Sequence, residues 1–157
     1  MSDKGRLVVV LACCVTLAAA IVGLTAGRAD AQKGKTLTLR ESATMKVTKN
    51  DEESGETLAA GSGTGTFDSK VRLRVHILNG SKLSARFVSK SSRGNLIGAG
   101  GARYSVSGSI LRFFGTVKII GGTGAYSDAR GHGINVEGVL NRLRERMTMT
   151  LDGRISF

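Results

Sequence analysis

The stretch IIGGTGAYSDARGHG, residues 119–133, decides how the rest of the chain is interpreted. It holds Gly121, Gly122 and Gly124, followed by an aromatic residue, an arginine and a histidine. A phosphate-binding P-loop would need Gly-Lys-Ser/Thr after the glycines and a helix beyond them. This stretch lacks that sequence, and residues of alternating polarity follow it, which is typical of a strand. We therefore interpret it as a connection between strands and not as a phosphate-binding loop.

Working outward from this stretch, the chain repeats a period of two, the pattern of half-buried strands. Residues 37–47, LTLRESATMKV, place apolar side chains on one face with Glu41 among them. Residues 67–78 alternate in the same way and are followed by Asn79-Gly80, a pair typical of a two-residue hairpin turn of type I′. We predict that the strand after this turn continues the apolar face, and that residues 50–56, NDEESGE, form an acidic loop.

The second half of the chain shows the same alternation. Strands are predicted in four further segments: residues 94–108, 110–120, 128–136 and 141–151. The whole pattern amounts to roughly seven or eight short strands without a crossover helix, so the fold class is all-β, a sandwich or a barrel. Closure into a barrel would remove the exposed strand edges.

The first 31 residues have the features of a secretory signal peptide. A basic start is followed by an uncharged run from Leu7 to Leu24 and by the Ala29-Asp30-Ala31 cleavage pattern. We predict cleavage after Ala31, a linker over residues 32–36, a single domain over residues 37–157, and a secreted protein. The alternative is an uncleaved membrane anchor formed by residues 7–24, which is short for a span.

Cleavage would remove both cysteines, so the mature domain would have no disulfide, no reactive thiol and no cysteine-type zinc site. Three of the 23 Lys and Arg residues and two of the 12 Asp and Glu residues lie in the leader. The mature net charge is therefore +10, and it favours anionic partners such as cell-surface polymers. The alternative interpretation is simply a solvated barrel exterior.

Five residues are candidates for the lining of a ligand pocket: Glu41, Tyr104, Arg130, His132 and Glu145. Glu41 and Glu145 are single carboxylates on otherwise apolar strand faces, where an unpaired charge is costly. Arg130 and His132 share the parity of apolar positions further along their strand. A Glu–Arg–His cluster inside an apolar pocket could act as an acid or base, or orient a substrate. The alternatives are structural ion pairs, or a bulge that reverses the direction of these side chains.

Other site chemistries are poorly supported. The two histidines show no spacing typical of metal ligands, so we expect no metal and no cofactor. We also expect no nucleic-acid partner, because the predicted outer faces carry arginines and lysines but, apart from Phe114, no aromatic residue for base stacking. Asn79 lies in an Asn-Gly-Ser sequon and would be glycosylated only in a host that modifies secreted proteins.

The Gly-Gly-Thr-Gly motif, the aromatic Tyr126 and the Ala129-Arg130-Gly131 triplet resemble the dirigent proteins and the wider group of allene-oxide-cyclase-like barrels. The resemblance spans about residues 36–157. It implies an eight-stranded antiparallel barrel with an internal pocket. It also implies that Gly121, Gly122 and Gly124 form a tight structural corner, since glycine permits positive φ and close packing.

The resemblance further implies a function. Members of these families hold an apolar substrate inside the barrel and direct its coupling or cyclisation, so we expect a small apolar or phenolic ligand. Barrels of this kind often form homo-oligomers. The sequence leaves a second hypothesis open: a non-enzymatic extracellular protein whose arginine-rich exterior binds an anionic surface or partner.

Overall fold

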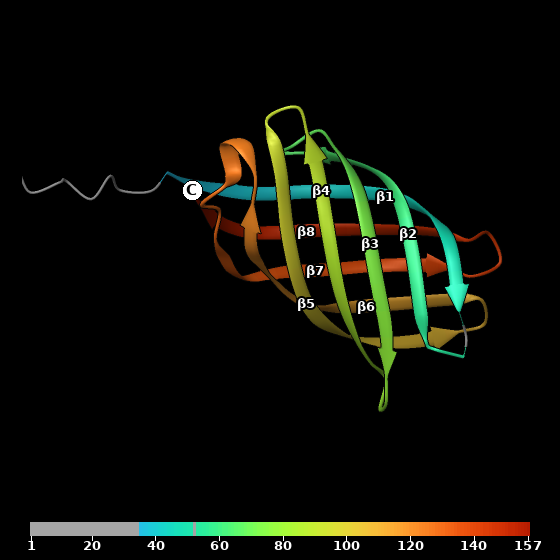
Figure 1. Ribbon diagram of the computed structural model, residues 1–157. Coiled ribbons are helices and arrows are strands. Elements are labelled where there is room, and N and C mark those ends of the chain that lie inside the picture. Colours follow the sequence, from blue (N-terminus) through green and yellow to red (C-terminus); the bar gives the residue numbers. More distant parts are fainter. Residues whose placement is uncertain (1–34, 52) are drawn as a thin grey trace, which may run out of the picture. The chain divides into compact units, whose positions relative to one another are not determined.

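The computed structural model describes residues 35–51 and 53–157, which form one closed antiparallel barrel (Figure 1). Each strand pairs with the next along the chain, and the first strand pairs with the last. The elements are β1 (Thr36–Asp51), β2 (Glu56–Gly65), β3 (Ser69–Leu78), β4 (Lys82–Ser91), β5 (Gly94–Ser107), β6 (Ile110–Gly122), the short 3-10 helix η1 (Gly124–Tyr126), β7 (Gly131–Asn141) and β8 (Arg146–Ser156). The predicted all-β fold and eight-stranded barrel are confirmed.

The alternating residues of the sequence become the inner and outer faces of the barrel. In β1, Leu39, Glu41, Ala43 and Met45 are buried while the residues between them are exposed. The same alternation buries the apolar side chains of β3 and β8 that were expected to face inward, namely Val71, Leu73, Val75, Met147, Met149 and Leu151. Because the strands enclose one space, these side chains meet in a single core.

The strand β2 was not predicted from the sequence. Its buried positions are Thr57, Ala59 and Gly63, which are too small or polar to give an apolar strand pattern. Small residues are required here because β1 lies close: a side chain on Gly61 would overlap the backbone at Thr44 and Met45. The predicted acidic loop over residues 50–56 is therefore too long, since only residues 52–55 connect β1 and β2.

The predicted hairpin between β3 and β4 is present, but its turn differs from the expected type. Leu78 pairs with Lys82, so three residues form the loop. Positive φ angles occur at Gly80 (73°) and Ser81 (56°), one position later than a type I′ turn at Asn79-Gly80 would have them. The carbonyl of Ser81 accepts a hydrogen bond of 3.0 Å from the backbone N–H of Tyr104, which ties this loop to β5.

The two ends of the barrel differ. One end, formed by the β2–β3, β4–β5 and β6–β7 connections, is filled by the buried ring of Tyr126 from η1. This ring makes edge-to-face contacts with Phe67, at a centroid distance of 5.1 Å, and with Phe157, at 5.6 Å. We call it the closed end. The opposite end carries the other four hairpin connections and is open, as described below.

Two of the three glycines of the predicted corner are structurally required. Gly124 has φ of 62°, and a side chain on Gly122 would overlap the backbone oxygens of Tyr126 and Asn95. Gly121 meets neither condition, because the space around it is free within 4 Å and its φ is not positive. The expectation that all three glycines are needed for the corner is therefore wrong for Gly121.

The predicted signal peptide, its cleavage after Ala31 and the alternative anchor over residues 7–24 all lie outside the described residues. Within the described part of the chain, no helix has the length and apolar character needed to cross a membrane. The predicted linker over residues 32–36 overlaps the barrel by one residue, because β1 begins at Thr36.

Candidate functional site

A hollow of about 850 Å³ occupies the open end of the barrel. The β1–β2, β5–β6 and β7–β8 connections surround it, and the inward side chains of the adjacent strand ends form its floor. Apolar side chains are prominent in this lining, including Ile77, Tyr104, Leu111, Leu140 and Leu143. Ligand pockets for small molecules span about 300–1,000 Å³, so this hollow has the size of a ligand site.

A smaller apolar cavity of about 50 Å³ lies inside the barrel. Thr57, Ile77, Leu111 and Leu140 line both spaces, so the inner cavity lies directly next to the hollow. The hydroxyl of Thr57 donates a hydrogen bond of 2.8 Å to Oδ1 of Asn50, so the polar atom at this junction has a fixed direction. The inner cavity is too small for a whole ligand, but it is large enough to receive part of one.

Charged groups are placed around the hollow. Asp51, Glu53 and Glu145 supply carboxylates and Arg142 supplies a guanidinium group. The backbone N–H of Ser54 donates to Asp51 at 3.1 Å and lowers the pKa of that carboxyl. Arg142 donates through Nη2 to the carbonyl of Gly108 at 2.6 Å. The open end thus combines an apolar floor with a charged rim.

Glu41 faces inward as expected, but it lies in the half of the barrel nearer the closed end. It lines a separate small cavity of about 20 Å³. Its carboxylate accepts hydrogen bonds from the backbone N–H of Phe67 at 3.1 Å and from the hydroxyl of Ser69 at 3.4 Å. Burial raises the pKa of Glu41, and the hydrogen bond from Phe67 partly opposes that shift. These contacts connect β1 to the β2–β3 turn.

Tyr104 lies on β5 with its side chain half-buried and packed against the core. It lines the open hollow, as the sequence analysis expected for a pocket residue. Tyr104 and Glu41 are therefore on the inside of the same barrel but in different spaces. Phe87 and Met149 line both the inner apolar cavity and the Glu41 cavity, so their side chains stand between the two.

Arg130 and His132 do not face the barrel interior; both are exposed. The cause is a β-bulge at the start of β7, because Val117 and Ile119 of β6 pair with Ile134 and Gly131. The two-residue interval on β6 therefore pairs with a three-residue interval on β7. The extra residue of β7 reverses which positions face the barrel interior before the bulge. The backbone of Arg130 instead forms an isolated antiparallel bridge with Ser156, through two hydrogen bonds of 2.8 Å.

Glu145 is not on a strand. Asn141 pairs with Arg146, so residues 142–145 form the β7–β8 turn, and Glu145 has φ of 50°. The side-chain oxygen of Asn141 accepts the N–H of Arg144 at 3.0 Å and ends the strand there. The predicted strand over residues 141–151 therefore begins too early, and the expected Glu–Arg–His cluster does not form.

Several residues of the open end were missed by sequence reasoning. Asn50 and Asp51 were assigned to a loop, Thr57 to no element and Arg142 to an outward strand position. For Asn50 and Asp51 the period-two signal is weak, because the bulge between Val47 and Lys49 shifts the register of β1 against β2. Asn79, in the Asn-Gly-Ser sequon that the sequence showed, is exposed in the β3–β4 turn.

Metal binding has no structural support in the described residues, where no group of three or more His, Cys, Asp or Glu side chains is placed to hold an ion. No protein-family model, no curated protein and no solved structure matches the chain. The resemblance to dirigent and allene-oxide-cyclase-like barrels therefore stays a prediction from the motif around Tyr126.

Proposed function

We propose that this protein binds a small apolar or phenolic molecule at the open end of its barrel. The observation that carries the proposal is the 850 Å³ hollow at the open end, together with the 50 Å³ apolar cavity that lies next to it inside the barrel. A ligand would insert an apolar group past Ile77 and Leu111 and keep its larger part in the hollow. Apolar walls with a few polar groups are the usual composition of small-molecule sites.

The rim favours a ligand with a polar end. A phenolic hydroxyl could donate to a carboxylate such as Asp51 or accept from Arg142, since both groups border the hollow. Tyr104 and Thr57 also line the hollow, and their hydroxyl groups would offer further partners. This distribution orients an amphipathic molecule with its apolar part inward.

Coupling or cyclisation of the bound molecule, as the resemblance implies, is the finer form of this proposal. Its chemistry would have to use rim groups, because the buried carboxylate of Glu41 lies beyond Phe87 and Met149. Binding and orientation alone require no such group. The proposal therefore rests on binding, and directed coupling would be a consequence of holding one geometry.

A thermal-shift screen against phenolics, fatty-acid derivatives and terpenoids tests the proposal. A ligand at about a hundred times its dissociation constant stabilises the fold by about 2.7 kcal/mol. Ala85→Leu narrows the inner cavity, which Ala85 lines. Ala60→Leu is the matched control, because Ala60 lies on the outward parity of β2. We expect the first variant to lose the shift and the second to retain it; equal loss in both, or no shift with any compound class, would contradict the proposal.

A further inference from the structure

The excess of positive over negative charge lies in one half of the barrel. From Ser69 to Gly122, across β3, β4, β5 and β6, the sequence has ten Lys and Arg residues and no Asp or Glu. The rest of the chain from residue 32 has ten basic and ten acidic residues, so it is neutral overall. The net charge of +10 predicted for the mature chain therefore belongs entirely to these four consecutive strands.

All ten of these basic side chains are exposed. Arg93 lies in the β4–β5 turn, with its guanidinium carbon 5.9 Å from the ring centre of Tyr126. The others occupy outward strand positions and form what we call the basic face: Lys70, Arg72, Arg74, Lys82, Arg86, Lys90, Arg103, Arg112 and Lys118. Figure 1 shows β3, β4 and β5 side by side, so their outer side chains share one continuous surface.

The strand register brings like charges directly opposite each other on this face. The facing pairs are Lys70 with Lys90, Arg74 with Arg86, and Lys82 with Arg103. Directly opposed like charges destabilise a sheet, since facing side chains start only about 4.5–5.5 Å apart. The cations of these three pairs repel each other, and an anion bound between them would reduce that repulsion.

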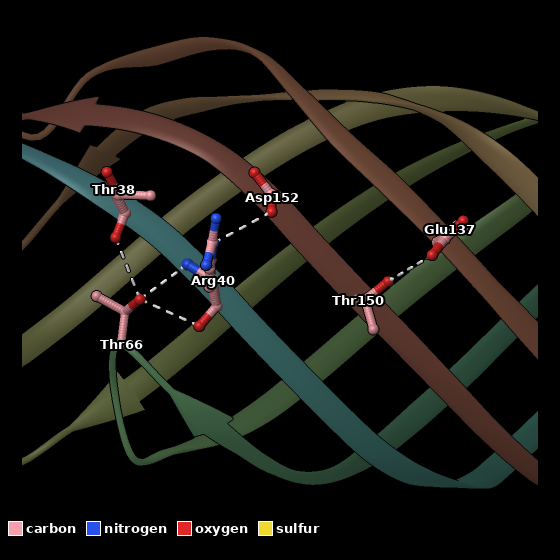
Figure 2. A network of polar contacts seen from close by, with 6 residues as sticks. All are labelled: Thr38, Arg40, Thr66, Glu137, Thr150 and Asp152. Atoms are coloured by element: carbon pink, nitrogen blue, oxygen red, sulfur yellow. Dashed lines mark hydrogen bonds and ion pairs between the residues drawn. The ribbon is translucent and has the colours of Figure 1, made fainter.

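Internal compensation of this charge is small. Among the ion pairs of the described residues, one involves the basic face: Arg74 lies 3.1 Å from Glu56. The opposite side of the barrel is different, as Figure 2 shows. There Arg40 of β1 lies 3.5 Å from Asp152 of β8, and Glu137 of β7 accepts a hydrogen bond from Thr150 of β8. That side carries acidic as well as basic groups, although Lys46 of β1 faces Arg146 of β8, whereas the strands of the basic face contain no acidic residue.

The outer surface of β5 separates two rows of the basic face. Ala99 pairs with Arg86 on one side and with Lys118 on the other, and Gly101 follows two residues along. The outer surface of β5 therefore carries no side chain larger than the methyl group of Ala99 between Arg86 and Lys118. Phe114 stands at one end of this region, 64% exposed and directly opposite Arg103. An extended chain could lie along β5 with its anionic groups between cations and a ring face against Phe114.

We infer that the basic face binds an extended acidic polysaccharide. Many separated cations suit a partner that repeats a negative charge along its length, because each contact releases counterions. A single-stranded nucleic acid would need several stacking rings, and Phe114 is the one exposed aromatic side chain on the described basic face. A membrane surface would need an apolar cluster beside the cations. The exposed Ile77, Leu78, Val106 and Leu143 lie at the open end instead, and β6 contributes only Phe114 and Ile120, on opposite sides of Lys118 in the sequence.

Binding of the purified protein to fluorescein-labelled polygalacturonate, measured across a series of salt concentrations, tests this inference. The triple variant Arg86→Gln, Lys90→Gln and Lys118→Gln removes three cations of the basic face. The control variant Lys46→Gln, Arg146→Gln and Arg154→Gln removes three exposed cations from β1 and β8, with the same change in net charge. Both variants are checked for unchanged thermal unfolding, and neutral dextran serves as the uncharged polymer.

We expect the face variant to bind at least about tenfold more weakly and to reduce the slope of log Kd against log salt by about two. The control variant should stay within about twofold of the unaltered protein, because its cations are outside the face. Equal weakening in both variants would show that net charge alone is responsible. Tighter binding to oligothymidylate or to phosphatidylglycerol vesicles at the same salt would overturn the choice of partner, and so would no binding at low salt. The outer-face variants leave the open-end lining intact, so this test is independent of the small-ligand proposal.

Discussion

Replacement of Tyr126 tests whether one aromatic ring completes the closed end of the barrel. The side chain is 2% exposed and contacts two other rings, those of Phe67 and Phe157. Truncation of a buried aromatic residue to alanine costs about 3–5 kcal/mol, so we expect Tyr126→Ala to lower the free energy of unfolding by about 4 kcal/mol. With an unfolding entropy of about 2.1 cal/mol/K for each of roughly 120 residues, Tm should fall by about 15 °C.

Guanidinium denaturation followed by far-UV circular dichroism measures this loss, with Tm from a thermal scan as a second measure. Tyr126→Phe is the control, because it keeps the ring and both edge-to-face contacts, and it should cost less than about 1 kcal/mol. Tyr126→Leu should fall between the two, since it keeps apolar bulk but loses the aromatic contacts. The reasoning would be refuted if Tyr126→Ala cost less than about 1 kcal/mol, or if the phenylalanine variant were as unstable as the alanine variant.

Two further predictions follow from the same half of the barrel. Gly122→Ala should lower the free energy of unfolding by about 1–3 kcal/mol in chemical denaturation, because its methyl group would overlap two backbone oxygens. The adjacent Gly121→Ala is the control: its surroundings are open and its φ is not positive, so it should be neutral or stabilise by up to about 1 kcal/mol. Equal destabilisation by both changes would contradict the geometry. The pKa of Glu41 is raised from 4.5 by burial, so the folded protein holds this proton to a higher pH than the unfolded chain does. The contribution of Glu41 to stability is therefore greatest below pH 4.5 and declines as pH rises through the folded pKa. Glu41→Gln should remove that decline, as urea denaturation at several pH values would show, whereas parallel pH profiles for the two proteins would rule the mechanism out.

The candidate site was only partly predictable. Glu41 and Tyr104 face inward as their parity indicated, because β1 and β5 keep a regular alternation where these residues lie. Arg130 and His132 alternate in the sequence with the same period as the buried Ile134 and Val136. A single extra residue in β7 nevertheless turns them outward. Glu145 was assigned to a strand because its parity matches Met147, whereas the Asn141 side chain begins a turn before it. Bulges and turns of this kind depend on the partner strand and leave little trace in the local pattern.

The sequence alone determined the class of this protein: strands, a common inward face for alternate residues, and a chain long enough to bury one core. In a sheet with one face in solvent, every second side chain is buried, and apolar and polar residues therefore alternate. This alternation can be recognised in the sequence itself. Only the tertiary structure decided which end of the barrel is open, which carboxylates border the hollow, and that the cations of β3–β6 share one surface. These properties depend on strand order and register, which bring together residues far apart in the chain and are set by the closure of the whole barrel.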